Sequence, residues 1–273
     1  MRTATFNIPD DRDKLYEVIK YPAGEIQVRL TAGGIDACTN KTRYIISANP
    51  IPDIIELAQL KSALDGIRRW DDRVLELMYL PYARADRRFQ PGDCYGLKVF
   101  GDLINALGFD TVYSFDIHSD VSYSFVSNLI NLDPIHHYDQ ITPIIKNLGS
   151  KGLCLIAPDK GAKARYDLDT YGLPVITGGK VRKAKTGALS GFTIEPTIKK
   201  YKKGLIIDDI CDGGGTFVGL AKEIHRVNPK IKLSLYVSHG IFSKGTPLPG
   251  IDNIYISDYS FKGKFHNQFE EVK

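Results

Sequence analysis

Short apolar runs alternate with amphipathic stretches along almost the whole chain, and this alternation restricts the fold more than any other feature. The runs are apolar on both faces, as in strands of a parallel sheet that helices cover on both sides. Residues 54–67 and 97–107 repeat apolar side chains at helical spacing, and Gly108 follows the second stretch as a C-cap signal. The sequence therefore predicts an α/β fold. The predicted strands are Glu25–Leu30, Tyr44–Ala48, Val74–Leu80, Thr111–Phe115, Gly152–Ala157, Pro174–Thr177, Gly204–Ile207, Lys232–Val237 and Asn253–Ile256.

The chain has 273 residues, which is enough for two ordinary domains. The stretch Asn131–Lys151 contains Pro134 and Pro143 and falls between two series of strands and helices. We therefore predict a domain boundary there, with domains at residues 1–138 and 139–273.

Charge and cysteine usage exclude several classes of protein. The net charge of +4 comes from 36 basic and 32 acidic residues and suits small anionic substrates. The basic residues form no dense stripe in the sequence, so we expect no nucleic-acid partner. The four cysteines lie far apart without a CxxC pair, which argues against a zinc cage or a disulfide framework and favours the cytoplasm. No segment approaches the roughly 20 apolar residues of a membrane span, and the N-terminus has no signal-peptide pattern, so no membrane partner is expected.

The sharpest local signal is the segment 204–216. An apolar run ends in Asp208 and Asp209, three glycines follow Asp212, and residues 217–227 then repeat apolar side chains at helical spacing. Backbone amides of such a turn can approach a phosphate closely, and the helix start adds unpaired N–H donors. Carboxylates at the end of a strand can accept hydrogen bonds from sugar hydroxyls or bind a metal. A tight strand-to-helix turn with solvated acids is the alternative interpretation.

The run IDDICDGGGT resembles the phosphoribosyl pyrophosphate loop of type I phosphoribosyltransferases and of phosphoribosyl pyrophosphate synthetases. Gly213 stands where these families usually have threonine, which removes one hydroxyl contact. The resemblance implies that the two acids hold the ribose hydroxyls and that the turn holds the 5-phosphate. With an arginine from a cationic loop upstream, the implied ribose 5-phosphate site is Arg182, Asp208, Asp209, Asp212, Gly213, Gly214, Gly215 and Thr216.

Five upstream segments resemble the synthetases in particular. PYARADRR at 81–88 is similar to their ATP-contacting segment, and FDIH at 115–118 and PDKG at 158–161 are similar to their metal-contacting segments. Residues 177–187 resemble their catalytic flexible loop with its K-x-R pair, and PAGE at 22–25 resembles a segment that reaches a neighbour's adenine. Ala23 and Ala85 depart from the usual residues. Taken singly, each segment also fits a simple structural role, such as a solvated basic turn or a helix N-cap.

These segments occur in family order over about residues 20–240, so the chain is identified as a member of the ribose-phosphate diphosphokinases, the phosphoribosyl pyrophosphate synthetases. The resemblance implies two similar domains of the type I phosphoribosyltransferase fold, each a mostly parallel sheet flanked by helices. It also implies transfer of the β,γ-diphosphoryl group of ATP to O1 of ribose 5-phosphate, Mg²⁺ as cofactor and a homo-oligomer, either a dimer or a hexamer.

The same resemblance assigns roles to individual residues. It implies Lys180 and Arg182 as catalytic residues, Gly24, Glu25, Arg84, Asp86, Arg87 and His118 as ATP contacts, and His118 and Asp159 as metal ligands. Two rival interpretations stay open. One is a phosphoribosyltransferase that consumes phosphoribosyl pyrophosphate, and the other is a non-catalytic regulatory subunit associated with a synthetase.

Overall fold

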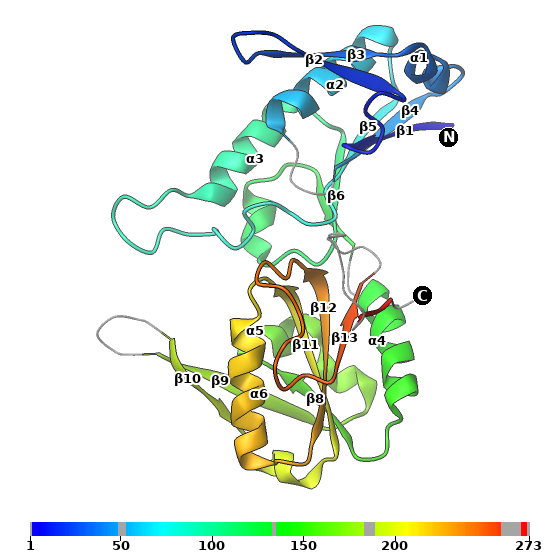
Figure 1. Cartoon of the computed structure of the whole chain (residues 1–273). Coiled ribbons are helices and arrows are strands. Elements are labelled where there is room, and N and C mark those ends of the chain that lie inside the picture. Colours follow the sequence, from blue (N-terminus) through cyan, green and yellow to red (C-terminus); the bar gives the residue numbers. More distant parts are fainter. Residues whose placement is uncertain (1, 49–52, 133–134, 183–188, 258–268, 272–273) are drawn as a thin grey trace. The chain divides into compact units, whose positions relative to one another are not determined.

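The computed structural model describes residues 2–48, 53–132, 135–182, 189–257 and 269–271. The chain divides into two compact units, Met1–Leu132 and Asp133–Lys273. The division falls within the stretch 131–151, where the sequence predicts a domain boundary. Each unit is built on its own mainly parallel sheet with flanking helices, which confirms the predicted α/β class (Figure 1). In the described part of the chain, no helix has the length and apolar character needed to span a membrane.

The first unit contains a five-stranded parallel sheet in the order β1-β4-β5-β6-β7 and an antiparallel hairpin of β2 and β3. Its core is one cluster, in which buried leucines of α2 and α3 pack against the sheet. The strands are β1 (Thr3–Ile8), β2 (Tyr16–Lys20), β3 (Ile26–Leu30), β4 (Arg43–Ala48), β5 (Asp72–Glu76), β6 (Thr111–Ser114) and β7 (Leu129–Asn131). The helices are α1 (Ala32–Cys38), α2 (Ile54–Ile67), α3 (Gly96–Leu107) and the short 3₁₀ helix η1 (Asp120–Ser124).

The second unit contains a seven-stranded sheet in the order β10-β9-β8-β11-β12-β13-β14, in which only the β9–β10 pair is antiparallel among the described strands. Its strands are β8 (Leu153–Ala157), β9 (Val175–Arg182), β10 (Leu189–Ile194), β11 (Lys203–Cys211), β12 (Lys232–Gly240), β13 (Asn253–Ile256) and β14 (Phe269–Glu271). Its helices are α4 (Ile135–Leu148), α5 (Lys160–Tyr166) and α6 (Gly215–Val227), with 3₁₀ helices η2 (Leu168–Tyr171) and η3 (Pro196–Lys200).

Both faces of the second sheet are buried. Successive residues of its central strands point to opposite faces and pack into two separate hydrophobic clusters. On β11, Ile206 belongs to the cluster under α6, whereas Leu205 and Ile207 belong to the cluster under α4 and α5. This arrangement explains why the strands read as continuous apolar runs rather than as alternating patterns. It also leaves the carboxyl ends of the strands as the place where polar side chains can gather.

Several segments differ from the expectation drawn from the sequence. The predicted strand Val74–Leu80 is β5, which ends at Glu76, and strands β1, β2, β7, β10 and β14 were not predicted. The stretch 131–151 holds α4, although Pro143 lies inside the helix, because Ile141 and Ile144 on one face are buried against the sheet. Residues 177–182 of the expected cationic loop belong to β9, where Lys180 pairs with Phe192 of the antiparallel neighbour. The remainder of that loop, residues 183–188, lies outside the described residues.

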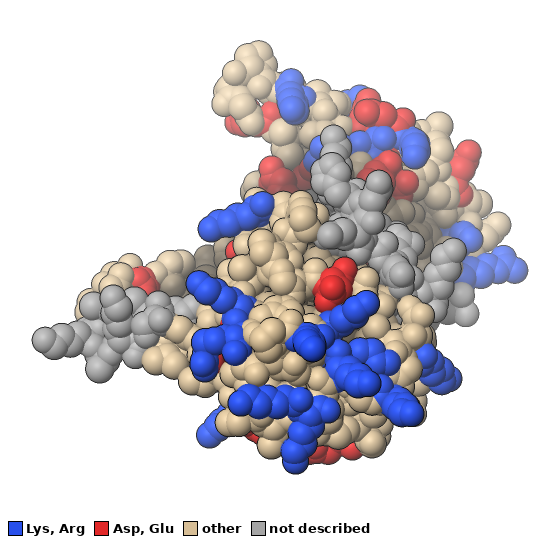
Figure 2. Space-filling model, turned by 60° about the horizontal axis from the view of Figure 1, so that its bottom comes forward, with Lys and Arg blue, Asp and Glu red and all other residues tan. Residues whose placement is uncertain are grey.

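Exposed lysines gather at the edge of the second sheet where the strands begin, opposite the edge that carries Asp208. Backbone hydrogen bonds from Lys202 and Lys203 to Gly152, and from Lys232 to Lys202, join the connections that enter β8, β11 and β12. Basic side chains predominate on this face of the unit (Figure 2). The described exposed lysines of this edge are Lys151, Lys199, Lys200, Lys202, Lys230 and Lys232. The fold therefore collects basic residues that the sequence alone presents as dispersed.

Candidate functional site

An ion pair joins two of the predicted site residues at the carboxyl edge of the second sheet. Asp159 caps α5, and its Oδ1 accepts hydrogen bonds from the amides of Gly161 and Ala162 at 3.0 and 3.1 Å. Its other oxygen, Oδ2, accepts from Nζ of Lys180 on β9 at 2.9 Å. Burial by itself would raise the pKa of Asp159, but the Lys180 amine and the helix amides together hold that pKa below its usual value. Asp159 is therefore a carboxylate at neutral pH.

Asp208 and Asp209 lie at the same edge, on β11, and have different environments. Asp209 is 3% exposed, and its carboxylate lies 2.9 Å from the guanidinium of Arg165 on α5. Within the described part of the chain Asp208 has no ion pair, and burial followed by the charges of Asp209 and Asp159 raises its pKa well above the usual value. The charge of Asp209 is therefore balanced by Arg165. Asp208 resists ionisation unless a cation or a hydrogen-bond donor binds next to it.

The glycine turn after β11 forms the start of α6. Gly214 adopts a left-handed conformation with φ 71°, and α6 begins at Gly215 without a side-chain cap. The first amides of a helix have no intrahelical acceptor, so the amides of Gly215 and Thr216 are donors for an anion at this turn. Asp212 also lies at this turn, and its Oδ1 accepts a hydrogen bond of 2.5 Å from the hydroxyl of Ser243. This bond holds the Asp212 carboxyl group on the side of Ser243.

In the first unit, Asp86 connects the segment after β5 with the segment after β6. Arg87 donates two hydrogen bonds to Asp86, at 2.9 and 2.7 Å. These bonds hold the pKa of Asp86 below its usual value against the effect of burial, with smaller contributions from a Ser119 hydrogen bond and the His118 charge. β5 and β6 are parallel neighbours, so their carboxyl ends lie at the same edge of the sheet. Residues 84–87, which follow β5, and His118, which follows β6, therefore lie at this edge.

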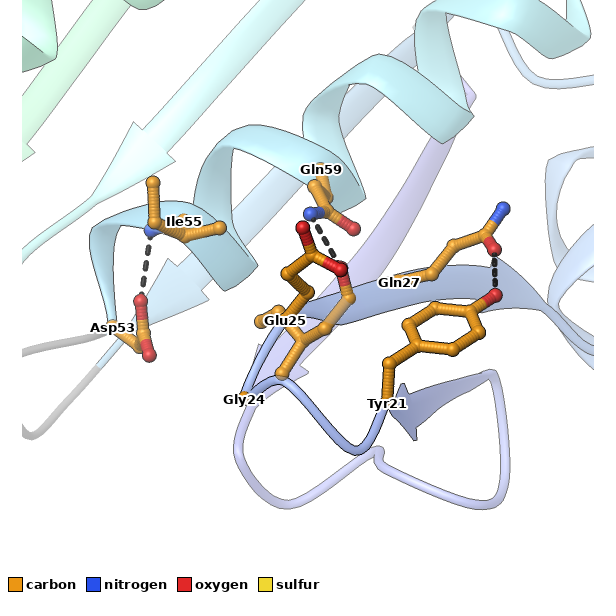
Figure 3. A pocket seen from close by; sticks show the side chains of 8 residues that line it. Tyr21, Gly24, Glu25, Gln27, Asp53, Ile55 and Gln59 are labelled. Carbon is orange, nitrogen blue, oxygen red and sulfur yellow. Dashed lines mark hydrogen bonds between the residues drawn. The ribbon is translucent and has the colours of Figure 1, made fainter.

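Gly24 and Glu25 lie elsewhere in the first unit, at the tip of the β2–β3 hairpin. Gly24 has φ 92° and donates its N–H to the Tyr21 carbonyl at 2.9 Å. A hollow of about 730 Å³ lies between this tip and the start of α2 (Figure 3). Gln59 anchors the hairpin there, since its amide donates to the Ile26 carbonyl at 2.9 Å. Figure 3 shows Tyr21 and Glu25 bordering the hollow.

The predicted metal ligands belong to different units, His118 to the first and Asp159 to the second. Within the described residues there is no group of three or more His, Cys, Asp or Glu side chains that could hold a metal ion. Arg182 is the last residue of β9, and its side chain lies outside the described part. Arg84 follows β5 in the same segment as Asp86.

Curated relatives share sequence with this chain over most of its length. The ribose-phosphate pyrophosphokinase of Mycoplasma genitalium is 29% identical over 265 residues, which cover 91% of this chain and 77% of that protein. The enzyme of the same name from Mycoplasma pneumoniae is 29% identical over 233 residues, covering 84% of this chain and 68% of the relative. The relative of this name from Thermococcus kodakarensis is 28% identical over 236 residues, covering 84% and 79%.

The chain is thus similar to ribose-phosphate pyrophosphokinases over most of its length. No family model matches the sequence. The fold is similar to that of the phosphoribosylpyrophosphate synthetase from Mycobacterium smegmatis, whose structure aligns with a TM-score of 0.75 at 17% identity. That alignment covers 100% of this chain and 94% of the synthetase. The predicted α/β fold of two mainly parallel sheets with flanking helices is therefore confirmed.

Sequence reasoning missed two residues that the structure places at the candidate site. Arg165 is the partner of Asp209, and the side chain of Lys244 lies over Gly213. Arg165 lies six residues after Asp159, the N-cap of α5. A helix predicted to start after Asp159 would therefore have placed Arg165 within two turns of this edge. Lys244 follows β12, which pairs in parallel with β11. Because parallel strands end at the same edge of a sheet, the loop that carries Lys244 lies at the edge that carries the glycine turn.

The raised pKa of Asp208 gives a prediction about stability. A carboxyl whose pKa is higher in the folded than in the unfolded protein destabilises the fold as pH rises above the ordinary carboxyl pKa. We expect Asp208→Asn to increase the free energy of unfolding at pH 8 by more than about 1 kcal/mol, and by less near pH 4. Urea unfolding of metal-free protein at both pH values measures this.

Asp209→Asn is the matched control for that experiment, because it removes the charged partner of Arg165 and should lower stability. Equal urea midpoints for wild type and Asp208→Asn at pH 8 would show that Asp208 is not held in an unfavourable charged state.

Proposed function

We propose that this protein is a ribose-phosphate diphosphokinase, which transfers the β,γ-diphosphoryl group of ATP to O1 of ribose 5-phosphate. One observation carries the proposal. Asp159, Lys180, Asp208 and Asp209 gather at one sheet edge beside the glycine turn, in a chain similar to ribose-phosphate pyrophosphokinases over most of its length. We assign ATP contacts to residues 1–138 and ribose 5-phosphate binding to residues 139–273.

Ribose 5-phosphate would bind along β11 and the turn that follows it. Asp208 and Asp209 would accept hydrogen bonds from the ribose hydroxyls, and such donors would stabilise the ionised form of Asp208. The 5-phosphate would lie on the amides of residues 212–216 at the start of α6. Both acids lie within one β-strand, so the sugar would be fixed relative to Lys180 two strands away in the sheet.

The chemical step needs no protein nucleophile. O1 of the sugar attacks the β-phosphorus, the bond from that phosphorus to the α,β-bridging oxygen breaks, and AMP leaves with this oxygen. The proton of the O1 hydroxyl passes to solvent or to a basic phosphate oxygen. Lys180 and Arg182 would stabilise the negative charge that develops around the β-phosphorus, and holding both substrates orients them for in-line attack. For this role the Lys180 amine has to leave its ion pair with Asp159 and bind phosphate oxygens instead.

The first unit would supply the nucleotide contacts. Arg84 and Arg87 suit phosphate oxygens, because a guanidinium can donate two parallel hydrogen bonds to them. Asp86 would hold Arg87 in position through two hydrogen bonds and would attract His118 electrostatically. We also propose a cytoplasmic homo-oligomer, in which Gly24 and Glu25 of a neighbouring copy would complete the adenine site.

The donor set suits magnesium bound together with ATP. Mg²⁺ is commonly held by one or two carboxylates with substrate phosphates and waters, so a single ionised Asp159 fits this role without a cluster of three ligands. His118 would be the second contact. Bound Mg²⁺ would neutralise phosphate charge and orient the transferring group.

Separation of nucleotides after incubation with ATP, Mg²⁺ and ribose 5-phosphate tests the proposal. We expect AMP to form only when the sugar phosphate is present, in an amount equal to the ATP consumed. ADP as the product would indicate transfer of a single phosphoryl group and contradict the proposal. Survival of ATP, with consumption of phosphoribosyl pyrophosphate and a base in a parallel sample, would instead indicate a phosphoribosyltransferase.

A further inference from the structure

The connection between β12 and β13 lies against the glycine turn of the ribose 5-phosphate site. The amides of Ile241 and Phe242 both donate to the carbonyl of Cys211, at 2.8 and 3.1 Å. Ser243 donates to the carboxylate of Asp212 at 2.5 Å. These three bonds fix the start of the connection to the end of β11, so the next residue, Lys244, has a defined place beside the turn.

The side chain of Lys244 occupies the space that Gly213 leaves open. A Cβ atom at position 213 would lie 3.2 Å from Cδ, 3.3 Å from Cε and 3.4 Å from Cγ of Lys244. The aliphatic stem therefore passes directly over the glycine, and a Cβ atom at 213 would require it to shift by a few tenths of an ångström. Lys244 is exposed, and among the described residues its amine has no ion pair.

Two other cations at this edge, Arg165 and Lys180, are paired with carboxylates. Arg165 lies 2.9 Å from Asp209, and Lys180 lies 2.9 Å from Asp159. The acidic side chain of Asp212 also lies at this turn, so a phosphate bound there gains from a nearby cation. Lys244 has no ion pair within the described residues, and its stem passes over Gly213 in the phosphate-binding turn.

We propose that Lys244 binds the 5-phosphate of ribose 5-phosphate and so selects phosphorylated sugars at this site. This inference rests on the proposed function of residues 212–216 as the phosphate turn. Lysine is a flexible point charge that commonly binds phosphates, and its stem packs over a residue without a side chain. The lysine and Gly213 act as a pair, because a Cβ atom at 213 would crowd the lysine stem and displace it by a few tenths of an ångström.

The first test compares the Michaelis constant for ribose 5-phosphate between wild type and Lys244→Met, which keeps the stem length and removes the charge. A hydrogen bond to a charged group contributes about 1.5–3 kcal/mol, so we expect this constant to rise roughly 10- to 100-fold while that for ATP stays within about threefold. Lys230→Met, at the opposite edge of the sheet, is the matched control and should change neither constant. An unchanged constant for ribose 5-phosphate in Lys244→Met would overturn the inference.

The second test uses Gly213→Ala, which introduces the crowding Cβ. Gly213 does not have a positive φ, so alanine fits its backbone without strain. We expect Gly213→Ala to weaken ribose 5-phosphate binding in the wild-type background and to have little further effect on Lys244→Gly, where the stem is absent. Additive losses in the double variant would contradict the pairing of the two residues.

Binding measured without turnover separates this inference from the proposed reaction. Calorimetric titration of ribose 5-phosphate into nucleotide-free protein should show the same loss of affinity for Lys244→Met as the kinetics. If wild type binds the sugar phosphate and Lys244→Met does not, Lys244 is a phosphate contact even if no AMP forms. If wild type does not bind ribose 5-phosphate in the presence or absence of Mg²⁺, both the phosphate turn and the role of Lys244 are refuted.

Discussion

Replacing Lys180 with alanine should lower kcat by about 100-fold or more and change the dissociation constant for ATP by less than about threefold. The reason is that the Lys180 amine is committed to Asp159 at 2.9 Å before substrates bind, so it adds little to ground-state binding. Its charge is needed when negative charge develops around the β-phosphorus. Steady-state kinetics together with direct titration of ATP separates the two effects.

Lys180→Arg keeps the positive charge and is the matched variant for this experiment. It should retain more turnover than Lys180→Ala, with the remaining deficit reflecting a different hydrogen-bond geometry. If alanine reduces ATP affinity and turnover by the same factor, Lys180 contributes uniform binding and not stabilisation of the transition state.

Replacing Asp209 with asparagine should raise the Michaelis constant for ribose 5-phosphate by about 10-fold or more, with a smaller effect on that for ATP. Asp209 is 3% exposed and lies at the end of the strand that leads to the phosphate turn. A carboxylate accepts hydrogen bonds from hydroxyl groups more strongly than an amide does, by about 1 kcal/mol or more. Initial-rate kinetics with each substrate varied in turn measures the effect.

Arg165→Met distinguishes a role in sugar binding from a role in structure alone. Arg165 is the partner of Asp209 at 2.9 Å, so both variants break the same ion pair. If Asp209 contacts the sugar, Asp209→Asn should impair ribose 5-phosphate binding more than Arg165→Met does. Equal losses would assign Asp209 a positioning role through Arg165.

Much of the fold follows from local patterns in the sequence. The predicted helix at 54–67 has those bounds in the structure, and Gly108 ends α3 in the left-handed conformation with φ 67°. Helix α4 was not predicted, because Pro143 reads as a helix breaker and only tertiary packing of Ile141 and Ile144 offsets it. The end of β9 reads as a loop because it carries Lys180 and Arg182, and its pairing with β10 depends on a non-local partner.

The residues of the candidate site also differ in how far local sequence patterns could predict them. Asp208, Asp209 and the glycine turn are visible in one continuous motif, so the sequence could predict them together. The contact of Lys180 with Asp159 depends on the pairing of β8 with β9, and that of Lys244 with Gly213 depends on the pairing of β11 with β12. Such contacts join residues distant in the sequence, and no local spacing encodes them. The assigned roles of all these residues stay predictions.

The most direct test of the central claim is phosphorus NMR of the reaction with ATP that carries ¹⁸O at the α,β-bridging position. Attack of the sugar O1 on the β-phosphorus leaves this oxygen on AMP. We therefore expect ¹⁸O-shifted AMP together with a sugar-linked diphosphate, both dependent on ribose 5-phosphate and Mg²⁺. Unchanged ATP, or ¹⁸O released in pyrophosphate with a sugar-linked AMP, would contradict diphosphoryl transfer by this protein.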